Sequence, residues 1–277
     1  MKFKNIFLTL LAATVAGFTM TGCNDNNNNE KGNILHPIAE HVIGKWSMVK
    51  SQMKQDGKWV EAPIPEGSGL TYTLRTDGTV LSALTAPDGY TKLNPGEWKV
   101  DEATGKLTLG TMTVDVLNLD ATSLVMGHDV ACNPETGEPM EGEFRWTLAR
   151  MDESRKTLAE QLVGKWNFSK SCEKKDGEWV EITYGVPDEG WHRYREDATW
   201  TAYSRRGENE KTIDMNWAAN TTTGVVRFTG GDGQASTVKV AIEADGTLSL
   251  FYENNVDPST GQVVTGEYKD VLVRAQE

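Results

Sequence analysis

An internal repeat constrains the fold of this chain more than any other feature of its sequence. Residues 38–61 match residues 158–181 at 13 of 24 positions. The match resumes at several later points, so that the whole repeat is about 120 residues long. A repeat of this length is sufficient for an independently folded domain. The sequence therefore predicts two homologous domains, at residues 34–150 and 151–277.

Residues 1–22 have the features of a secretory signal peptide. Lys2 and Lys4 give a positive start, and residues 6–18 form an apolar stretch that is too short to span a membrane comfortably. Met20-Thr21-Gly22-Cys23 then resembles the bacterial lipobox, with Met as a variant first residue. The resemblance implies that Cys23 becomes a lipidated N-terminus, with palmitate among the acyl groups. It also implies that the protein is a cell-envelope lipoprotein, with the outer membrane as the expected location.

A polar, Asn-rich segment follows the predicted lipidation site. Residues 23–33 contain no apolar side chain after Cys23, so this segment cannot bury enough surface to order itself. We expect it to act as a tether between the lipid and the folded domains. The membrane is then a partner through the anchor. The sequence is compatible with either the periplasmic or the surface face of that membrane. The alternative interpretation is that Cys23 is a free or disulfide-bonded cysteine.

Each domain is expected to begin with a short helix and to continue as β-strands. Thr157-Leu158-Ala159-Glu160 has the capping-box pattern, and Pro37 suits a first helical turn. Later segments such as residues 113–117 and 237–242 are rich in β-branched residues. Asp-Gly and Thr-Gly pairs interrupt these segments, as in hairpins.

Consecutive hairpins without crossover helices predict an all-β fold. We expect two tandem small antiparallel up-and-down β-barrels, each opened by a short helix and built from about eight or nine strands. A membrane-spanning barrel is the alternative geometry. It requires longer strands with an uninterrupted apolar outer face, whereas the strands predicted here are short and carry charged residues throughout.

A Gly-x-Trp sequence follows each predicted helix, and an arginine ends each predicted last strand. The pairs are Trp46 with Arg150 and Trp166 with Arg274. These residues resemble the signature of the calycins, the group of lipocalins and fatty-acid-binding proteins, and the chain is similar to the tandem lipocalin-like lipoproteins of Gram-negative envelopes. The resemblance implies that each tryptophan stacks with its arginine at the closed end of a barrel. Such a cation–π contact contributes about 0.5 to 2 kcal/mol.

Basic and aromatic residues are the candidates for ligand binding. Lys50 and Lys170 share strand parity with Trp46 and Trp166, so strict alternation would place both lysines inside the open mouths of the barrels. There they could meet an anionic head group; the alternative is that they extend into solvent at the rim. The other candidates are Arg75, Arg195, Trp191 and Trp200.

Comparison of the copies adds two expectations about the second domain. Asp270 stands where the first domain has Trp146, so we expect an ion pair between Asp270 and Lys170 that closes the mouth. Trp191, Trp200 and Tyr203 have no aromatic counterparts in the first domain. We interpret these three as core residues; exposed together, they would suit sugar stacking or a protein interface.

Composition and motifs argue against several classes of function. With 40 acidic and 28 basic side chains, the chain is a poor partner for nucleic acid. It has no metal-ligand spacing and no nucleophile elbow, so we predict no metal, no cofactor and no enzyme activity. Cys132 and Cys172 could form a disulfide, but two separate buried thiols are the simpler interpretation.

These features together predict a monomeric envelope lipoprotein that acts as a non-catalytic binding or scaffolding module. One alternative is a carrier of a small hydrophobic or amphipathic ligand, which requires a barrel cavity of about 300 Å³ or more. A less favoured alternative is a hydrolase or isomerase, which requires titratable residues with perturbed pKa in a cleft. The expected partners, besides the membrane, are a small hydrophobic ligand or another protein of the envelope.

Overall fold

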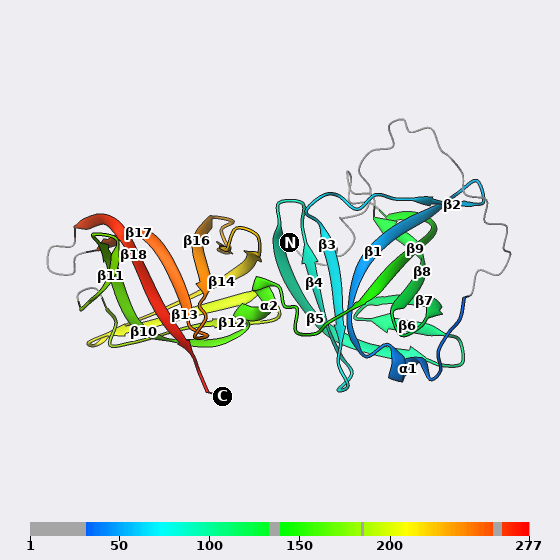
Figure 1. Cartoon of the computed structure of the whole chain (residues 1–277), viewed down its shortest axis with the longest axis horizontal. Coiled ribbons are helices and arrows are strands. Elements are labelled where there is room, and N and C mark those ends of the chain that lie inside the picture. The colour runs from blue at the N-terminus through cyan, green and yellow to red at the C-terminus, as the bar shows by residue number, and fades with distance from the viewer. Residues whose placement is uncertain (1–31, 133–138, 184–185, 257–261, 277) are drawn as a thin grey trace. The chain divides into compact units, whose positions relative to one another are not determined.

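The structure is a computed structural model that describes residues 32–132, 139–183, 186–256 and 262–276. The fold is all-β, as predicted, with an eight-stranded antiparallel barrel and further strands (Figure 1). Two short helices, α1 (Ile38–His41) and α2 (Leu158–Leu162), interrupt the strands at corresponding points of the repeat.

The described residues divide into two compact units. The first unit comprises the described residues up to Asp88 together with Asn94–Arg155. The second unit comprises Gly89–Leu93 and the described residues from Lys156 onward. The predicted boundary after Arg150 lies five residues before the division that the contacts give, and the short segment Gly89–Leu93 belongs to the second unit although its sequence lies within the first repeat.

In the first unit, antiparallel ladders connect β1, β3, β4, β5, β6, β7, β8 and β9 in that order, and β9 pairs back onto β1. Strand β2 forms a hairpin with the second half of β1. The strands of this unit are β1 (Gly44–Gln55), β2 (Lys58–Glu61), β3 (Gly69–Leu74), β4 (Thr79–Thr85), β5 (Tyr90–Asp101, of which residues 94–101 belong to this unit), β6 (Lys106–Leu109), β7 (Met112–Leu119), β8 (Ser123–Cys132) and β9 (Pro139–Met151).

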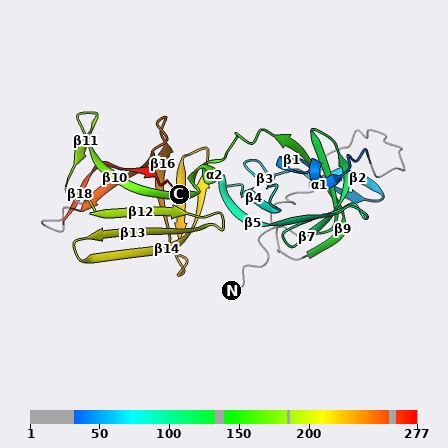
Figure 2. The same cartoon turned by 90° about the horizontal axis from the view of Figure 1, so that it is seen from below.

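In the second unit, the ladders follow the same order from β10 through β12 to β18, and β18 pairs back onto β10. Strands β12, β13 and β14 run side by side in Figure 2. The strands are β10 (Gly164–Lys175), β11 (Glu178–Ile182), β12 (Glu189–Tyr194), β13 (Thr199–Arg206), β14 (Asn209–Asn220), β15 (Val225–Thr229), β16 (Ala235–Ile242), β17 (Leu248–Val256) and β18 (Val263–Arg274).

Tight turns between strands follow the residues that the sequence singles out. At the β1–β2 turn both Asp56 and Gly57 have positive φ, at 49° and 77°. Two such residues in succession form the turn that matches the twist of a hairpin, and Asp and Gly tolerate this conformation best. The β10–β11 turn repeats this geometry at Asp176 and Gly177, with φ of 51° and 88°.

The helices are stabilised in different ways. In α2 the predicted capping box is present: the Thr157 side chain accepts from the Glu160 backbone N–H, and Glu160 accepts from the Thr157 N–H. Helix α1 has no side-chain cap of its own. Instead the Glu102 carboxylate accepts from the N–H groups of Ile38 and Ala39, at 3.0 and 2.8 Å. No local sequence pattern indicates this long-range cap.

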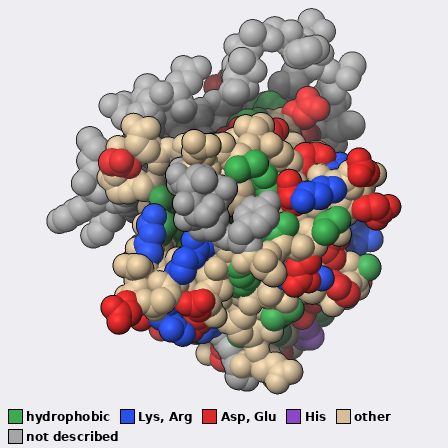
Figure 3. All heavy atoms as spheres, turned by 90° about the vertical axis from the view of Figure 1, so that its left-hand side faces the viewer, with side chains coloured by type: hydrophobic (Ala, Val, Ile, Leu, Met, Phe, Trp, Pro, Cys, Tyr) green, Lys and Arg blue, Asp and Glu red, His purple; other side chains and the backbone are tan. Residues whose placement is uncertain are grey.

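Each unit has its own aromatic and aliphatic core. In the first, the fully buried residues include Trp46, Leu107 and Leu148. In the second they include Trp166, Tyr194 and Tyr268. On the face of the second unit seen in Figure 3, acidic and basic side chains are interspersed and hydrophobic side chains occur singly, as on an ordinary solvated surface.

Candidate functional site

The Gly-x-Trp sequence and the last arginine of each repeat lie together in the structure. In the first unit the Arg150 guanidinium carbon is 4.2 Å from the centroid of the Trp46 ring. Its nitrogens donate to the carbonyls of His41, Ile43 and Ala121, at 2.6 to 2.9 Å. The buried Trp46 indole N–H donates in turn to the Val42 carbonyl at 2.7 Å. The arginine thus ties strand β9 to the segment that follows α1.

The second unit repeats this arrangement. The Arg274 guanidinium carbon lies 4.2 Å from the centroid of the Trp166 ring, and the Nη1 and Nη2 atoms donate to the carbonyls of Val163 and Gln161. Gly164 has a φ of +124°, and a Cβ placed there would lie 2.7 Å from Arg274 Nη1. Glycine is therefore required both by the backbone conformation and by the approach of the guanidinium.

Lys50 and Lys170 do not point into the units, so of the two interpretations that the sequence leaves open, the placement inside the barrel mouths is wrong. A β-bulge lies between Met48 and Lys50, and another lies between Phe168 and Lys170. One extra residue reverses the alternation of side chains beyond it. Lys170 is consequently half exposed and lies 3.9 Å from Glu181.

The expected ion pair between Asp270 and Lys170 is absent for the same reason. The bulge brings Ser171, instead of Lys170, directly opposite Asp270 in the β10–β18 ladder. Ser171 Oγ donates to Asp270 Oδ1, and the Tyr252 hydroxyl donates to the same oxygen at 2.8 Å. The acid that the sequence assigned to a salt bridge instead accepts hydrogen bonds from two hydroxyl groups.

Arg75 and Arg195 occupy equivalent turns that join β3 to β4 and β12 to β13. The backbone carbonyls of these arginines accept from the indole N–H groups of Trp98 and Trp217, at 2.9 and 3.2 Å. The Arg195 guanidinium donates to Thr201 at 2.9 Å. These arginines therefore organise the turns, at the end of the ladders where β1 and β10 begin.

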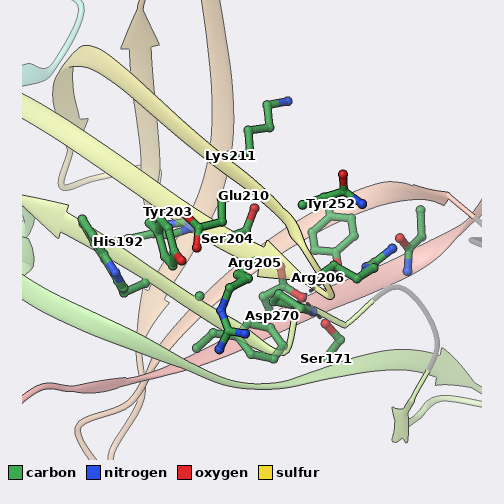
Figure 4. A pocket seen from close by; sticks show the side chains of 16 residues that line it. Ser171, His192, Tyr203, Ser204, Arg205, Arg206, Glu210, Lys211, Tyr252 and Asp270 are labelled. Atoms are coloured by element: carbon green, nitrogen blue, oxygen red, sulfur yellow. Dashed lines mark hydrogen bonds between the residues drawn. The ribbon is translucent and has the colours of Figure 1, made fainter.

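A pocket of about 520 Å³ opens at the other end of β12 in the second unit (Figure 4). Its wall is formed by β10, β12, β13, β14, β17 and β18, and polar and aromatic side chains line it together. The lining residues include Phe168, Ser171, Gly190, Trp191, His192, Tyr203, Ser204, Arg205, Arg206, Glu210, Lys211, Tyr252 and Asp270.

Asp270 is the most buried acid of this pocket. Burial raises the pKa of the Asp270 carboxyl above its ordinary value, against the hydrogen bonds from Ser171 and Tyr252, which favour ionisation. Burial also raises the pKa of the Tyr252 hydroxyl, and the charge of Asp270 adds to that effect. Figure 4 shows the three side chains converging on one point of the pocket wall.

The predicted aromatic candidates separate into two groups. Trp200 is buried, as expected for core, and its ring lies 4.4 Å from that of Phe228 and 5.2 Å from that of His192. Trp191 and Tyr203 are only half buried, so the core interpretation is wrong for this pair. Their rings stack across β12 and β13 with centroids 5.6 Å apart, at the edge of the pocket.

His192 lines the pocket between these two groups. Burial lowers the pKa of His192 to about 4, so the imidazole is uncharged at neutral pH. Within the described part of the chain, its buried Nδ1 has no hydrogen-bond partner. The aligned residue in the first unit is Tyr72, which is buried in the core.

Large side chains fill the corresponding space in the first unit. Trp146, in the position of Asp270, is 4% exposed and packs its ring 4.4 Å from that of His128. Leu70 and Leu84 stand in the positions of Gly190 and Ser204. A substitution of small and polar residues for large ones in the second copy is the sequence signal that could have located the pocket.

The remaining site predictions have different outcomes. Cys172 is a buried thiol within the second unit, and the side chain of Cys132 lies outside the described part of the chain. Among the described residues, no group of three or more His, Cys, Asp or Glu side chains could hold a metal ion. In the same part of the chain, no helix has the length and apolar character needed to cross a bilayer.

The predicted signal peptide and Cys23 lie outside the described residues. The predicted tether extends to residue 33, but its last two residues already belong to the folded body. Gly32 N–H donates to the Leu117 carbonyl at 2.7 Å, and Leu119 N–H donates to the Asn33 carbonyl at 2.9 Å. This backbone pairing is available to a polar sequence, because it buries no side chain.

No family model and no curated protein matches this chain. Among solved structures, the chain is similar to the crystal structure of a protein of unknown function from the DUF3598 family of Nostoc punctiforme. The two sequences are 12% identical, and the match covers 85% of this chain and 97% of the other, with a TM-score of 0.22. A likeness of this degree carries no information about what the chain binds.

Proposed function

We propose that the chain is a cell-envelope lipoprotein of two tandem lipocalin-like barrels, and that the second barrel binds a small amphipathic ligand. Strand order supports the tandem arrangement, because in each unit the ladders return to the strand from which they began. The Trp–Arg contacts at 4.2 Å support the calycin relationship of both units. The lipobox-like sequence before Cys23 supports attachment to a membrane, with the outer membrane as the proposed location.

The pocket in the second unit is the observation on which the binding function rests. Its volume of about 520 Å³ exceeds the roughly 300 Å³ that a small-molecule site requires. Apolar rings and a few placed polar groups line it together, as in most ligand sites. In the proposed protein the first unit serves as a filled structural domain, and it offers the surface for any scaffolding role.

A catalytic role is the second candidate, and the perturbed pKa values of Asp270 and His192 are the observation that favours it. The geometry favours binding over catalysis. Ser171 donates to Asp270, and the described ring contacts of His192 are with Tyr194 and Trp200. A nucleophile hydrogen-bonded to an imidazole base, which acyl transfer would require, is not among the described contacts.

Native mass spectrometry of protein released gently from its own membrane tests the binding function. We expect an added mass of a few hundred daltons besides the lipid. A Ser204→Leu variant, which places the residue of the first unit at the mouth of the pocket, should lose this mass, whereas Leu84→Ser should retain it. Wild-type protein without any added mass, and without affinity for small amphiphiles, would contradict the proposal.

Membrane attachment has a separate test. Cys23→Ser should abolish incorporation of labelled palmitate and should release the protein from the membrane fraction, because an acyl chain contributes about 0.8 kcal/mol per buried methylene. Cys132→Ser is the matched control and should leave both the labelling and the membrane attachment unchanged.

The chemical state of the ligand separates binding from catalysis. A ligand recovered chemically unaltered from the wild-type protein would favour binding, and its conversion would favour the catalytic candidate.

A further inference from the structure

The hydrogen bonds of Asp270 leave one of its oxygens for a ligand. Both neighbouring hydroxyls, of Ser171 and Tyr252, donate to Oδ1. Within the described residues, both donors to Asp270 contact Oδ1 and none contacts Oδ2. Oδ2 does not belong to the fully buried atoms without a partner, so it is accessible from the pocket. Since Asp270 lines the pocket, Oδ2 is the acceptor that the pocket presents.

We propose that the ligand of this pocket carries a primary ammonium group, which pairs with Oδ2 of Asp270 beside the rings of Phe168 and Tyr252. This inference rests on the proposed binding function of the second unit. An ammonium group supplies both the charge and the donors that a half-buried carboxylate lacks. Aromatic faces next to a carboxylate add cation–π attraction for the same group.

The other charged groups around the pocket are compatible with an ammonium ion at Asp270. Arg205 is paired with Glu189 at 3.2 Å. Arg206 and Lys211 are exposed at the mouth, where solvent and salt screen them, and Figure 4 shows Lys211 directed away from Asp270.

The two remaining titratable groups complete this environment. His192 is uncharged at neutral pH, because burial lowers its pKa to about 4. Glu210 is exposed at the rim, and its charge interacts with the Tyr203 hydroxyl. Asp270 is therefore the acid that an ammonium group reaches inside the pocket.

Ligands of other chemistry fit this environment less well. A carboxylate would have to lie beside the charge of Asp270, and like charges at short range repel. A hydroxyl could donate to Oδ2, but it would leave the charge of the carboxylate uncompensated. An ammonium group neutralises that charge, so its binding is expected to lower the pKa of Asp270 again.

Three probes of equal chain length separate these possibilities: hexylamine, 1-hexanol and hexanoate. Their binding to the purified full-length protein is measured at neutral pH by calorimetry and ligand-observed NMR. We expect hexylamine to bind at least tenfold more tightly than 1-hexanol and hexanoate. Asp270→Asn should weaken hexylamine binding at least tenfold and 1-hexanol binding less than twofold. Glu253→Gln is the matched control, an exposed acid of the same unit outside the pocket lining, and it should change hexylamine binding less than twofold.

The wild-type protein gives a test that does not depend on the folding of a variant. As the pH falls through the pKa of Asp270, hexylamine binding should weaken and 1-hexanol binding should not. Equal affinity for the three probes, or preference for hexanoate, would overturn the amine inference and leave the binding pocket intact. If none of the three probes binds and no native ligand is found, the binding function itself is wrong.

Discussion

The two units agree at one end of their ladders and differ at the other. Where the Gly-x-Trp strand begins, both keep an indole against a guanidinium, with centroid distances of 4.2 Å in each. At the opposite end, Trp146 in the first unit corresponds to Asp270 in the second. Trp146 packs against the ring of His128, whereas Asp270 accepts a hydrogen bond from Tyr252 and lines a pocket.

This difference indicates how a duplicated fold can acquire a site without losing stability. The shared end supplies the backbone hydrogen bonds and the closure that the fold requires, so it tolerates little change. The other end holds core side chains in the first unit and a pocket in the second. We therefore interpret the second unit as the more specialised copy and the first unit as the copy that retains the filled core.

The largest effect is expected from transferring the acid into the filled unit. Trp146→Asp should destabilise the first unit by about 4 kcal/mol or more, because it removes a buried indole and places a carboxyl in the cavity that results. Hydrogen exchange resolved by peptide would locate the loss within strands β8 and β9. Trp146→Phe is the control and should cost much less. A loss below about 1 kcal/mol for Trp146→Asp would mean that the first unit also tolerates a pocket.

The shared end should respond equally in both units. Arg150→Met and Arg274→Met should each destabilise their own unit by about 2 kcal/mol, because each removes a cation–π contact and the donors to carbonyls at the start of β1 or β10. Arg→Lys at the same positions retains the charge but loses the paired donors, and should give an intermediate loss. Unequal losses, measured by chemical denaturation with peptide-resolved exchange, would show that the units have diverged at this end too.

Much of this architecture could be predicted from sequence, because it depends on features that repeat. The glycine, tryptophan and arginine at the shared end occur twice at the same spacing, and the Asp-Gly turns have a strong conformational requirement. The capping box of α2 is encoded within four residues. Local signals of this kind survive without knowledge of the tertiary structure.

The pocket could not be predicted in the same way, because the bulge in β10 determines part of its lining. The sequence around Lys170 alternates regularly, and nothing in it marks the extra residue between Phe168 and Lys170. The shift exchanges Lys170 for Ser171 as the neighbour of Asp270, which changes an expected ion pair into a hydrogen-bond cluster. The cap that Glu102 provides to α1 is equally invisible, since it joins residues more than 60 positions apart.

Acid should destabilise the second unit through His192, which has Tyr72 as its counterpart in the first unit. The pKa of this imidazole is about 4 in the folded protein, below its ordinary value of 6.5, because burial disfavours the charged form. Between pH 6.5 and 4 the unfolded chain therefore binds more protons, so the stability that His192 confers above pH 6.5 is lost as the pH falls. We expect a loss of about 2 kcal/mol, which allows for the partial solvent contact of the side chain.

The matched variant isolates this contribution from that of Asp270. The raised pKa of Asp270 acts in the opposite direction, because it makes the unit more stable as the pH falls toward 3.8. His192→Phe removes only the imidazole, so the difference in unfolding free energy between wild type and variant should change by about 2 kcal/mol across the window. A difference that does not vary with pH would mean that His192 is solvated in the folded protein.

The smallest effect concerns one turn in which the units differ by a single residue. Gly78 in the β3–β4 turn has a φ of +82°, and Ala198 occupies the corresponding position in the β12–β13 turn with a φ of +60°. A Cβ at Gly78 would meet no atom closer than 4.0 Å, so Gly78→Ala should destabilise the first unit by the conformational term alone, about 1 kcal/mol. Ala198→Gly should relieve that term in the second unit, but it also removes a buried methyl group, so its net gain should stay below about 1 kcal/mol. Denaturation midpoints of the two variants compare the cost of backbone strain with the gain from methyl packing. If Gly78→Ala is neutral while Ala198→Gly is destabilising, packing of the methyl group outweighs backbone strain at this turn. The second unit would then have adapted to alanine.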